Sequence, residues 1–245
     1  MHEESRLQRE LADCGRLLLH YGLVHTTLGT ISAILDNDTR ICLVKPATLN
    51  YRNAQAGSFA RVNLQNELLD PTSSPPSLNF LVHIACYLAR PDIGAVIHTH
   101  PESVVKLISG RHSVWRKILK QKSDCPRYIP LTSEESVWFT KPSPKGSGGI
   151  PIVSDLRPKE LARAVGQAVH SADVVAIRNH GLIAVGHTLE DALNATLAAD
   201  SEARVLFDRI SGGFIPNIRN ISKIRQDLAC MPPYITLQLN RNMRR

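Results

Sequence analysis

The first half of the chain carries a hydrophobic pattern that predicts a helix, three strands and a second helix. Apolar residues recur at helical spacing from Leu7 to Leu18, and Gly22 helps to end this helix. Extended runs follow at 30–35, 41–44 and 59–64. Polar, turn-forming segments separate these runs, which is typical of antiparallel strands. Pro75 and Pro76 then precede a helical pattern over 77–88.

The second half alternates short apolar runs with helical segments. Strand-like runs lie at 94–97, 151–153, 174–178 and 182–186, and helical patterns at 102–108, 158–169 and 188–210. The segment 142–149 is rich in proline, glycine and serine, and we expect a flexible loop there that could close over a site. This order predicts an α/β fold with three layers (αβα), in which helices cover both faces of a central, mainly antiparallel sheet.

Length and composition favour one fairly large soluble domain. The 245 residues are 43% hydrophobic and 21% charged, which is ordinary for a globular protein. We expect a domain over 1–213 and a basic C-terminal extension over 214–245. No apolar run is long enough to span a bilayer and the N-terminus lacks a signal-peptide pattern, so we expect a cytoplasmic protein without membrane contact. The five cysteines are scattered and suggest reduced thiols.

The net charge of +7 changes this picture little. The excess of lysine and arginine lies at 111–127 and 219–245. Neither segment carries interleaved aromatic residues or a DNA-binding motif, so we expect no nucleic-acid partner. Apolar residues at helical spacing over 114–119 indicate a short amphipathic element, whose basic face is either simply solvated, a rim that attracts an anionic substrate, or a contact with another subunit.

Candidate chemistry begins with His98-Thr99-His100, directly after the apolar run 94–97. On a strand the side-chain period is two, so both imidazoles leave the same face about 7 Å apart, within reach of one metal ion. Two hydrogen-bonded histidines at a strand end would give the same pattern.

Asn179-His180-Gly181 forms a second histidine site between two strand-like runs. A tight turn there would direct His180 out of the sheet, and three neutral histidines can hold zinc or a related divalent ion. The alternative is a hairpin turn chosen for its backbone, in which Asn179 and Gly181 tolerate positive φ and His180 has no role.

Two stretches of the chain strongly resemble the class II aldolase and adducin superfamily: HIACYLARPDIGAVIHTHP at 83–101 and AIRNHGLIAVGHTLEDA at 176–192. The resemblance covers roughly residues 5–212. It implies His98, His100 and His180 as ligands of a divalent metal ion, usually zinc, with manganese or iron as alternatives. It also implies a homo-oligomer, usually a tetramer, with the metal near a subunit boundary.

The chain departs from this superfamily at the position of its acid and in its phosphate cradle. Aldolases carry glutamate, and the epimerase aspartate, where this chain has Asn79, which cannot shuttle protons near neutral pH. Gly-Asn-Leu/Ile-Ser, Pro-Thr/Ser-Gly and Ser-Ser or Ser-Lys are replaced by 29–32 (GTIS), 46–48 (PAT) and 77–78 (SL). The substrate-binding candidates that remain are Gly29, Thr30, Thr48 and Ser77, and a sugar phosphate becomes a doubtful substrate.

The chemistry that these residues predict is that of a metal-dependent lyase. A three-histidine metal ion can hold a small anionic hydroxy- or keto-compound through two oxygens and stabilise an enediolate while a C–C bond beside the carbonyl breaks. Aldol cleavage needs a base, whereas decarboxylation needs only this electron sink and a later protonation, so losing the acid at Asn79 harms an aldolase more. Possible replacements are Glu134, Glu135, Asp155 and Tyr128.

Two alternatives to a lyase stay open. One is a non-catalytic, adducin-like association domain, against which the retained histidine triplet counts. The other is a metal-dependent oxygenase or dehydratase on the same scaffold, which would favour iron over zinc.

Overall fold

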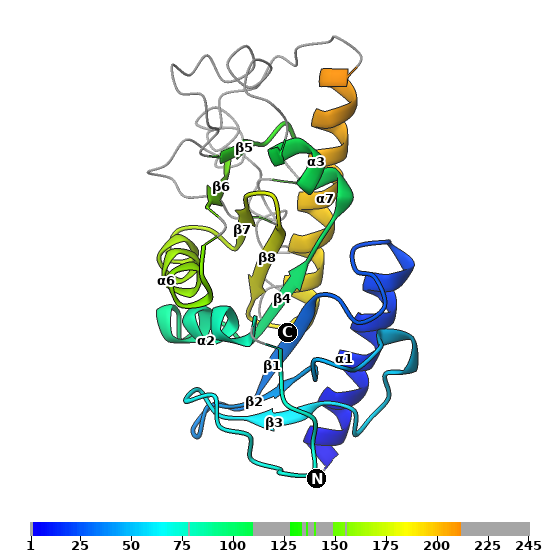
Figure 1. Ribbon diagram of the computed structural model, residues 1–245, viewed down its shortest axis with the longest axis vertical. Coiled ribbons are helices and arrows are strands. Elements are labelled where there is room, and N and C mark those ends of the chain that lie inside the picture. Colours follow the sequence, from blue (N-terminus) through cyan, green and yellow to red (C-terminus); the bar gives the residue numbers. More distant parts are fainter. Residues whose placement is uncertain are drawn as a thin grey trace, which may run out of the picture.

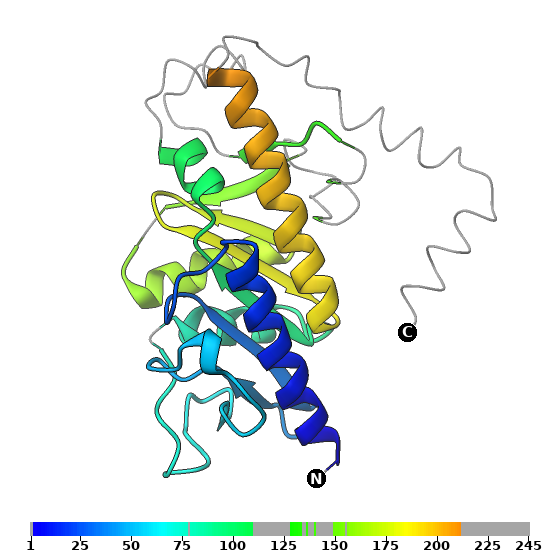
Figure 2. The ribbon, with the colours of Figure 1, turned by 90° about the vertical axis from the view of Figure 1, so that its right-hand side faces the viewer.

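The computed structural model describes residues 2–77, 79–109, 128–133, 136, 140, 149–154 and 156–211. These residues form one eight-stranded sheet with helices on both faces (Figures 1 and 2). The strands are β1 (Thr30–Asp36), β2 (Ile41–Val44), β3 (Ala60–Val62), β4 (Ala95–Thr99), β5 (Tyr128–Pro130), β6 (Gly149–Val153), β7 (Val174–Ile177) and β8 (Gly181–Gly186). The helices are α1 (His2–His20), α2 (Phe80–Ala89), α3 (Glu102–Ser109), α6 (Pro158–Val169) and α7 (Leu189–Ser211), with a 3-10 turn, η1, at Tyr51–Asn53.

The order of strands across the sheet is β3-β2-β1-β4-β8-β7-β6-β5. Every neighbouring pair is antiparallel except β6 and β7, which run parallel. β4 and β8 therefore lie side by side in the middle although more than eighty residues separate them. The predicted α/β fold with a mainly antiparallel sheet is confirmed.

The two faces of the sheet are covered by different helices. One core joins α2 and α6 to the sheet, and a pair of cores joins α1, α3 and α7 to the opposite face. Figure 2 shows α1 and α7 lying across that second face. Because side chains alternate along a strand, Val175 and Ile177 face α6 while Val174 and Ala176 face α7. Burial on both faces explains why 174–177 is continuously apolar.

Several element boundaries differ from the sequence expectation. β3 is shorter than 59–64, and α2 begins at Phe80 rather than 77 because Pro76 pairs with Pro46 in an isolated bridge. Gly149, expected in a loop, begins β6. β5 and the parallel pairing of β6 with β7 were not expected, since a three-residue strand leaves almost no pattern. The rest of the 142–149 segment, the amphipathic element at 114–119 and the extension at 214–245 lie outside the described residues.

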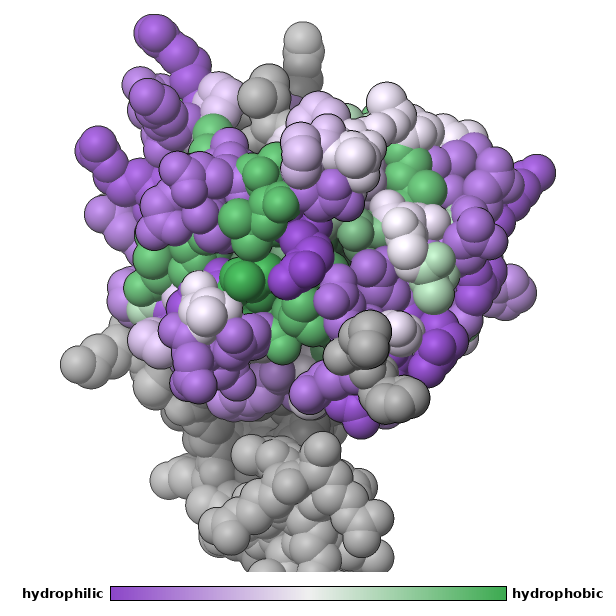
Figure 3. Space-filling model, turned by 90° about the horizontal axis from the view of Figure 1, so that it is seen from below, coloured by the Kyte–Doolittle hydropathy of each residue, from purple (hydrophilic) through white to green (hydrophobic). Residues whose placement is uncertain are grey.

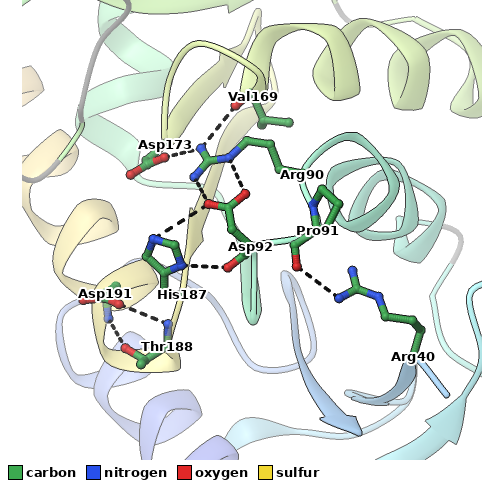
Figure 4. A network of polar contacts seen from close by, with 9 residues as sticks. All are labelled: Arg40, Arg90, Pro91, Asp92, Val169, Asp173, His187, Thr188 and Asp191. Atoms are coloured by element: carbon green, nitrogen blue, oxygen red, sulfur yellow. Dashed lines mark hydrogen bonds and ion pairs between the residues drawn. The ribbon is translucent and has the colours of Figure 1, made fainter. Parts of the chain in front are cut away.

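A polar network fastens the start of β4 to three neighbouring segments (Figure 4). Arg90, just after α2, donates to both carboxylate oxygens of Asp92 at 3.2 and 2.7 Å and also to Asp173, before β7. His187, between β8 and α7, bonds the Asp92 carbonyl at 2.8 Å through Nδ1. Thr188 and Asp191 then cap α7 reciprocally at 3.0 and 3.1 Å. The network therefore fixes the end of β4 opposite to its histidines.

The surface of the described part is predominantly polar. Seven large apolar side chains are exposed there, at Leu17, Tyr21, Leu28, Leu69, Leu88, Leu156 and Val205. On the face seen from below, apolar groups are surrounded by polar ones (Figure 3). Among the described helices, none combines the length and the apolar character that crossing a membrane requires.

The first prediction concerns the network around Arg90. Replacement by alanine removes the cation that faces Asp173, whose side chain is only 7% exposed, so we expect Arg90→Ala to lower the free energy of unfolding by about 2–3 kcal/mol. Urea denaturation followed by circular dichroism measures this value.

Arg6→Ala is the matched control, since Arg6 is 66% exposed and its ion pairs span 3.8 and 3.6 Å; we expect a loss below about 0.5 kcal/mol. The hydrogen bond from Arg90 lowers the pKa of Asp92. This stabilisation is present above the unfolded-state pKa and is lost as pH falls, so the difference between wild type and Arg90→Ala should narrow below about pH 4. Equal losses for Arg90→Ala and Arg6→Ala would contradict the role of the network.

Candidate metal centre

Strand β4 delivers two of the three histidines to one face of the sheet. Val96 packs into the core under α2, and the period of two places His98 and His100 on the same side. His98 is 1% exposed and lies opposite Thr30 on β1 and Ile183 on β8. The neighbouring strands thus surround His98 on both sides.

The turn between β7 and β8 delivers the third histidine. Asn179 adopts a left-handed conformation with φ of 57°, and the backbone N–H of His180 donates to the carbonyl of Ile177 at 3.1 Å. A Cβ atom at Gly181 would lie 2.2 Å from the Thr99 carbonyl oxygen and 2.9 Å from Cδ2 of His100. Only glycine therefore lets this turn approach the end of β4 closely.

The three imidazoles converge. Ring centroids are 4.7 Å apart for His98 and His100, 5.0 Å for His98 and His180, and 5.2 Å for His100 and His180. One nitrogen from each ring lies within 4.8 Å of the other two. His98 Nε2 and His100 Nε2 are 3.2 Å apart, close to the separation of about 3.3 Å that two nitrogens have around a tetrahedral zinc ion. The donor set therefore fits a divalent metal.

Backbone contacts fix which nitrogen of His98 can bind a metal. Nδ1 lies 3.0 Å from the carbonyl oxygen of Leu182 on β8. A carbonyl can only accept a hydrogen bond, so Nδ1 carries the proton and Nε2 keeps its lone pair. This arrangement, in which a backbone carbonyl orients a ligating imidazole, is common in metal sites.

Burial keeps the β4 histidines neutral. Desolvation lowers the pKa of His98 well below its usual value, and His100, His180 and His83 lower it further. Desolvation and His180 lower the pKa of His100 to about 4. Neutral imidazole is the form that binds metal ions, so these two rings are held in that form at physiological pH.

Three segments that contain the substrate-binding candidates meet beside His98. The hydroxyls of Thr30 and Ser77 lie 2.8 Å apart, and the backbone N–H of Ala47 donates to the Pro75 carbonyl at 3.0 Å. At Gly29, with φ of 78°, a Cβ would lie 2.7 Å from the carbonyl oxygen of His98. Gly29, Thr30 and Ser77 therefore lie together beside β4.

Thr48 and Asn79 lie at the edge of this arrangement. Thr48 is exposed in the turn after β2. Asn79 is half-buried at the N-terminus of α2, and its side chain makes no capping hydrogen bond. Of the possible replacements for an acid, Tyr128 lies half-buried on β5, while Glu134, Glu135 and Asp155 lie outside the described residues.

Lys45 is a residue that the sequence patterns did not single out. It follows β2, is 1% exposed, and donates through Nζ to the carbonyls of Thr27 at 2.8 Å and Pro46 at 3.1 Å. These bonds tie together the segments that contain Gly29 and Thr48. Burial lowers the pKa of Lys45 to about 8, and nothing in the apolar pattern around a strand end signals such a lysine.

The helix histidine His83 is also fully buried. Its Nδ1 lies 2.7 Å from Ser32 Oγ, which is 2.8 Å from the hydroxyl of Tyr87. Burial lowers the pKa of His83 to about 3. Its partner is Ser32 on β1, which in turn bonds Tyr87 one turn further along α2, and no local sequence pattern indicates these contacts.

Comparison with known proteins points to one family. The family model described as "Class II Aldolase and Adducin N-terminal domain" matches residues 9–207. Gamma-adducin of Mus musculus is 24% identical over 219 residues, which are 88% of this chain and 28% of that protein. L-ribulose-5-phosphate 4-epimerase UlaF of Salmonella typhi is 24% identical over 220 residues, 89% of this chain and 90% of that protein. The chain thus spans little more than a quarter of the adducin and nearly the whole epimerase.

Solved structures share this fold. YgbL of Klebsiella pneumoniae superposes with a TM-score of 0.75 at 22% identity, covering 91% of this chain and 98% of that one. An L-fuculose 1-phosphate aldolase superposes with a TM-score of 0.70 at 17% identity, covering 91% and 94%. At these identities the likeness establishes the architecture.

The second prediction is that zinc binding depends weakly on pH between 7.5 and 5.5. Protons compete for the ligand nitrogens only as pH approaches their pKa values, which are lowered for His98 and His100. We expect the affinity to fall by about tenfold or less, whereas three ordinary imidazoles would lose about a thousandfold. Competition with a chromophoric chelator measures the affinity at each pH.

His187→Ala is the matched control, because His187 is an exposed histidine in the network at the other end of β4. It should leave zinc binding unchanged. A thousandfold fall in the wild-type affinity would show that the β4 histidines are not held neutral.

Proposed function

We propose that this chain, which belongs to the class II aldolase and adducin family, is a divalent-metal-dependent lyase. Its substrate would be a small anionic hydroxy- or keto-compound, cleaved at the C–C bond beside its carbonyl. The observation that carries the proposal is the convergence of His98, His100 and His180, whose ligand atoms lie within 4.8 Å of one another.

Zinc is the metal we propose, with manganese and iron as alternatives. Three neutral imidazoles form a donor set that zinc accepts in catalytic sites while a coordination position stays open. A divalent ion held there supplies a Lewis acid that withdraws electrons from a carbonyl group. The register of β4 and β8 supports this by orienting His98 through the Leu182 carbonyl.

An amide in place of an acid at Asn79 favours decarboxylation over aldol cleavage. In decarboxylation the electron pair of the breaking bond stays on the carbon beside the carbonyl, carbon dioxide leaves, and that carbon then takes a proton. No base is needed to start this reaction. Aldol cleavage must first remove a hydroxyl proton, and the amide of Asn79 cannot accept one.

The hydroxyls of Thr30 and Ser77 support an anionic substrate. These two hydroxyls lie 2.8 Å apart. Lys45 Nζ donates to the carbonyls of Thr27 and Pro46, and so holds together the segments that contain Gly29 and Thr48. Hydroxyl donors beside the three histidines favour a carboxylate or a similar anion. Thr48 stands where the Pro-Thr/Ser-Gly turn has its glycine, which makes close backbone approach to a phosphate harder.

Two further functions remain candidates. The match to adducins supports an association domain, although such a domain would not need three converging imidazoles. An oxygenase or dehydratase on the same scaffold would select iron. By family resemblance we also expect a homo-oligomer, usually a tetramer, which sedimentation of the full chain would measure.

The experiment that tests the lyase is a metal-reconstitution assay. Chelator-treated protein should lose carbon dioxide release from a panel of hydroxy-keto acids, and about one zinc or manganese ion per chain should restore it. His100→Ala should lower kcat/KM by at least about a hundredfold and weaken zinc binding, because one of three ligands is lost. His187→Ala serves again as the control. Activity that survives complete metal removal would contradict the lyase, and activity that needs iron and consumes dioxygen would favour the oxygenase.

Asn79→Glu tests whether the missing acid limits aldol cleavage. Restoring a carboxylate through Asn79→Glu supplies a group that can accept a proton, so we expect aldol cleavage of a ketose phosphate to rise by about tenfold or more. Release of the aldehyde product, coupled to its reduction, measures the rate.

Asn79→Gln is the matched control, since it has the size of glutamate but cannot exchange a proton near neutral pH. It should leave aldol cleavage unchanged. No gain in Asn79→Glu over Asn79→Gln would show that the pocket is built for chemistry other than that of an aldolase.

A further inference from the structure

Three buried polar side chains, linked by hydrogen bonds, connect α2 to β1 next to β4. Tyr87, Ser32 and His83 are each no more than 1% exposed. Ser32 Oγ lies between the other two, 2.8 Å from the Tyr87 hydroxyl and 2.7 Å from His83 Nδ1. None of these three residues is among the candidate metal ligands or the substrate-binding candidates.

The number of available hydrogens decides which atom donates in each of these two hydrogen bonds. If Tyr87 donates to Ser32 and Ser32 donates to His83 Nδ1, the ring proton is on Nε2, and that N–H is the single donor left over. If Nδ1 carries the proton and donates to Ser32, a hydroxyl hydrogen of Ser32 or Tyr87 is left without an acceptor, and the Nε2 lone pair is unused as well. Because unpaired buried polar groups are costly, the first arrangement is favoured.

The structure agrees that one group is left over. Among the described residues, His83 Nε2 is a buried atom with no hydrogen-bond partner, while Ser32 Oγ and the Tyr87 hydroxyl both have one. An N–H group has no lone pair for a metal ion. The bond that Nε2 lacks is therefore one to an acceptor, and oxygen is the common acceptor in such a site.

The position of His83 places this donor beside the proposed site. Ser32 pairs with Val96, two residues before His98, and both side chains face α2. His83 is one helical turn after Asn79, where aldolases of the family carry their acid. Thr30, two residues before Ser32 on β1, pairs with His98, so the side chains of Ser32 and His98 lie on the same face of the sheet.

We propose that Tyr87 and Ser32 fix His83 with its proton on Nε2, and that this N–H donates to an oxygen atom held beside the three histidines. The inference rests on the proposed lyase function and makes His83 a positioning residue rather than a fourth ligand. The oxygen belongs either to the substrate or to water at the site, and the same donor chemistry serves both.

Nuclear magnetic resonance of the full chain with ¹⁵N-labelled histidine tests the donor directly. Long-range ¹H–¹⁵N correlations distinguish the two neutral tautomers, and His83→Gln assigns the signal. We expect the Nε2–H form. Zinc alone should shift this signal if the acceptor is water, whereas a shift only on adding zinc with oxalate assigns the acceptor to an oxygen of the bound anion. An Nδ1–H form, or no shift with either addition, would overturn the proposal.

Paired substitutions separate positioning from structural support. Gln places an N–H near the position of Nε2, whereas Asn places one near Nδ1. We expect His83→Asn to lower kcat by about a hundredfold and His83→Gln by less than about tenfold, with about one zinc per chain bound by both. If His83 only anchors α2 to Ser32, the order reverses; if it is a metal ligand, both variants lose zinc. Either result rejects the proposal.

Ser32→Ala keeps His83 and removes the group that fixes its proton, so the ring should become a mixture of tautomers. An unchanged spectrum would reject the role of Ser32 in fixing the proton of His83. This measurement holds if variants of His83 fail to fold, and it is independent of turnover. A protein without lyase activity could still show the Nε2–H form of His83 and a signal shift on adding zinc, or zinc with oxalate. That result would refute the proposed reaction but support His83 as a hydrogen-bond donor.

Discussion

The register of β4 against β8 is the constraint on which the rest of the structure depends. It pairs Thr99 with Leu182 and His98 with Ile183, and so places His180, the last residue before β8, beside His100. The approach is possible because Gly181 has no side chain to meet the Thr99 carbonyl. A slip of one residue would turn His98 and His100 to the other face and separate them from α2. Sheet pairing therefore brings the turn that carries His180 to the end of β4 that carries His98 and His100.

Burial on both faces of the sheet gives this arrangement its chemistry. The core under α2 and α6 excludes water from His98, which keeps the ring neutral, and the Leu182 carbonyl directs its free lone pair away from β8. The network of Arg90, Asp92 and His187 holds the other end of β4 (Figure 4). His98 is buried on a strand that is paired on both sides, so it would lose little conformational freedom on binding a metal ion, which is the kind of preorganisation that metal sites need.

Much of the fold could be predicted from the sequence, because long periodic segments carry strong signals. The helices around Leu11 and Leu161 and the two histidine-bearing segments lie where the patterns indicated. Three-residue strands such as β5 carry too few positions to show a period, and the parallel pairing of β6 with β7 depends on distant contacts that no local pattern encodes. The site divides in the same way. Spacing brought out His98 and His100, whereas the roles of Lys45 and of the Ser32, His83 and Tyr87 chain depend on burial and on partners more than ten residues away.

X-ray absorption spectroscopy at the zinc edge of the reconstituted full chain tests the central claim most directly, because it reports the atoms around the metal without assuming a substrate. The account predicts one zinc per chain surrounded by three imidazole nitrogens at about 2.0–2.1 Å and by oxygen in the remaining position. Replacing His180 by alanine should reduce the imidazole contribution from three to two. A spectrum with sulfur neighbours, or one that His180→Ala leaves unchanged, would contradict a metal centre built from His98, His100 and His180.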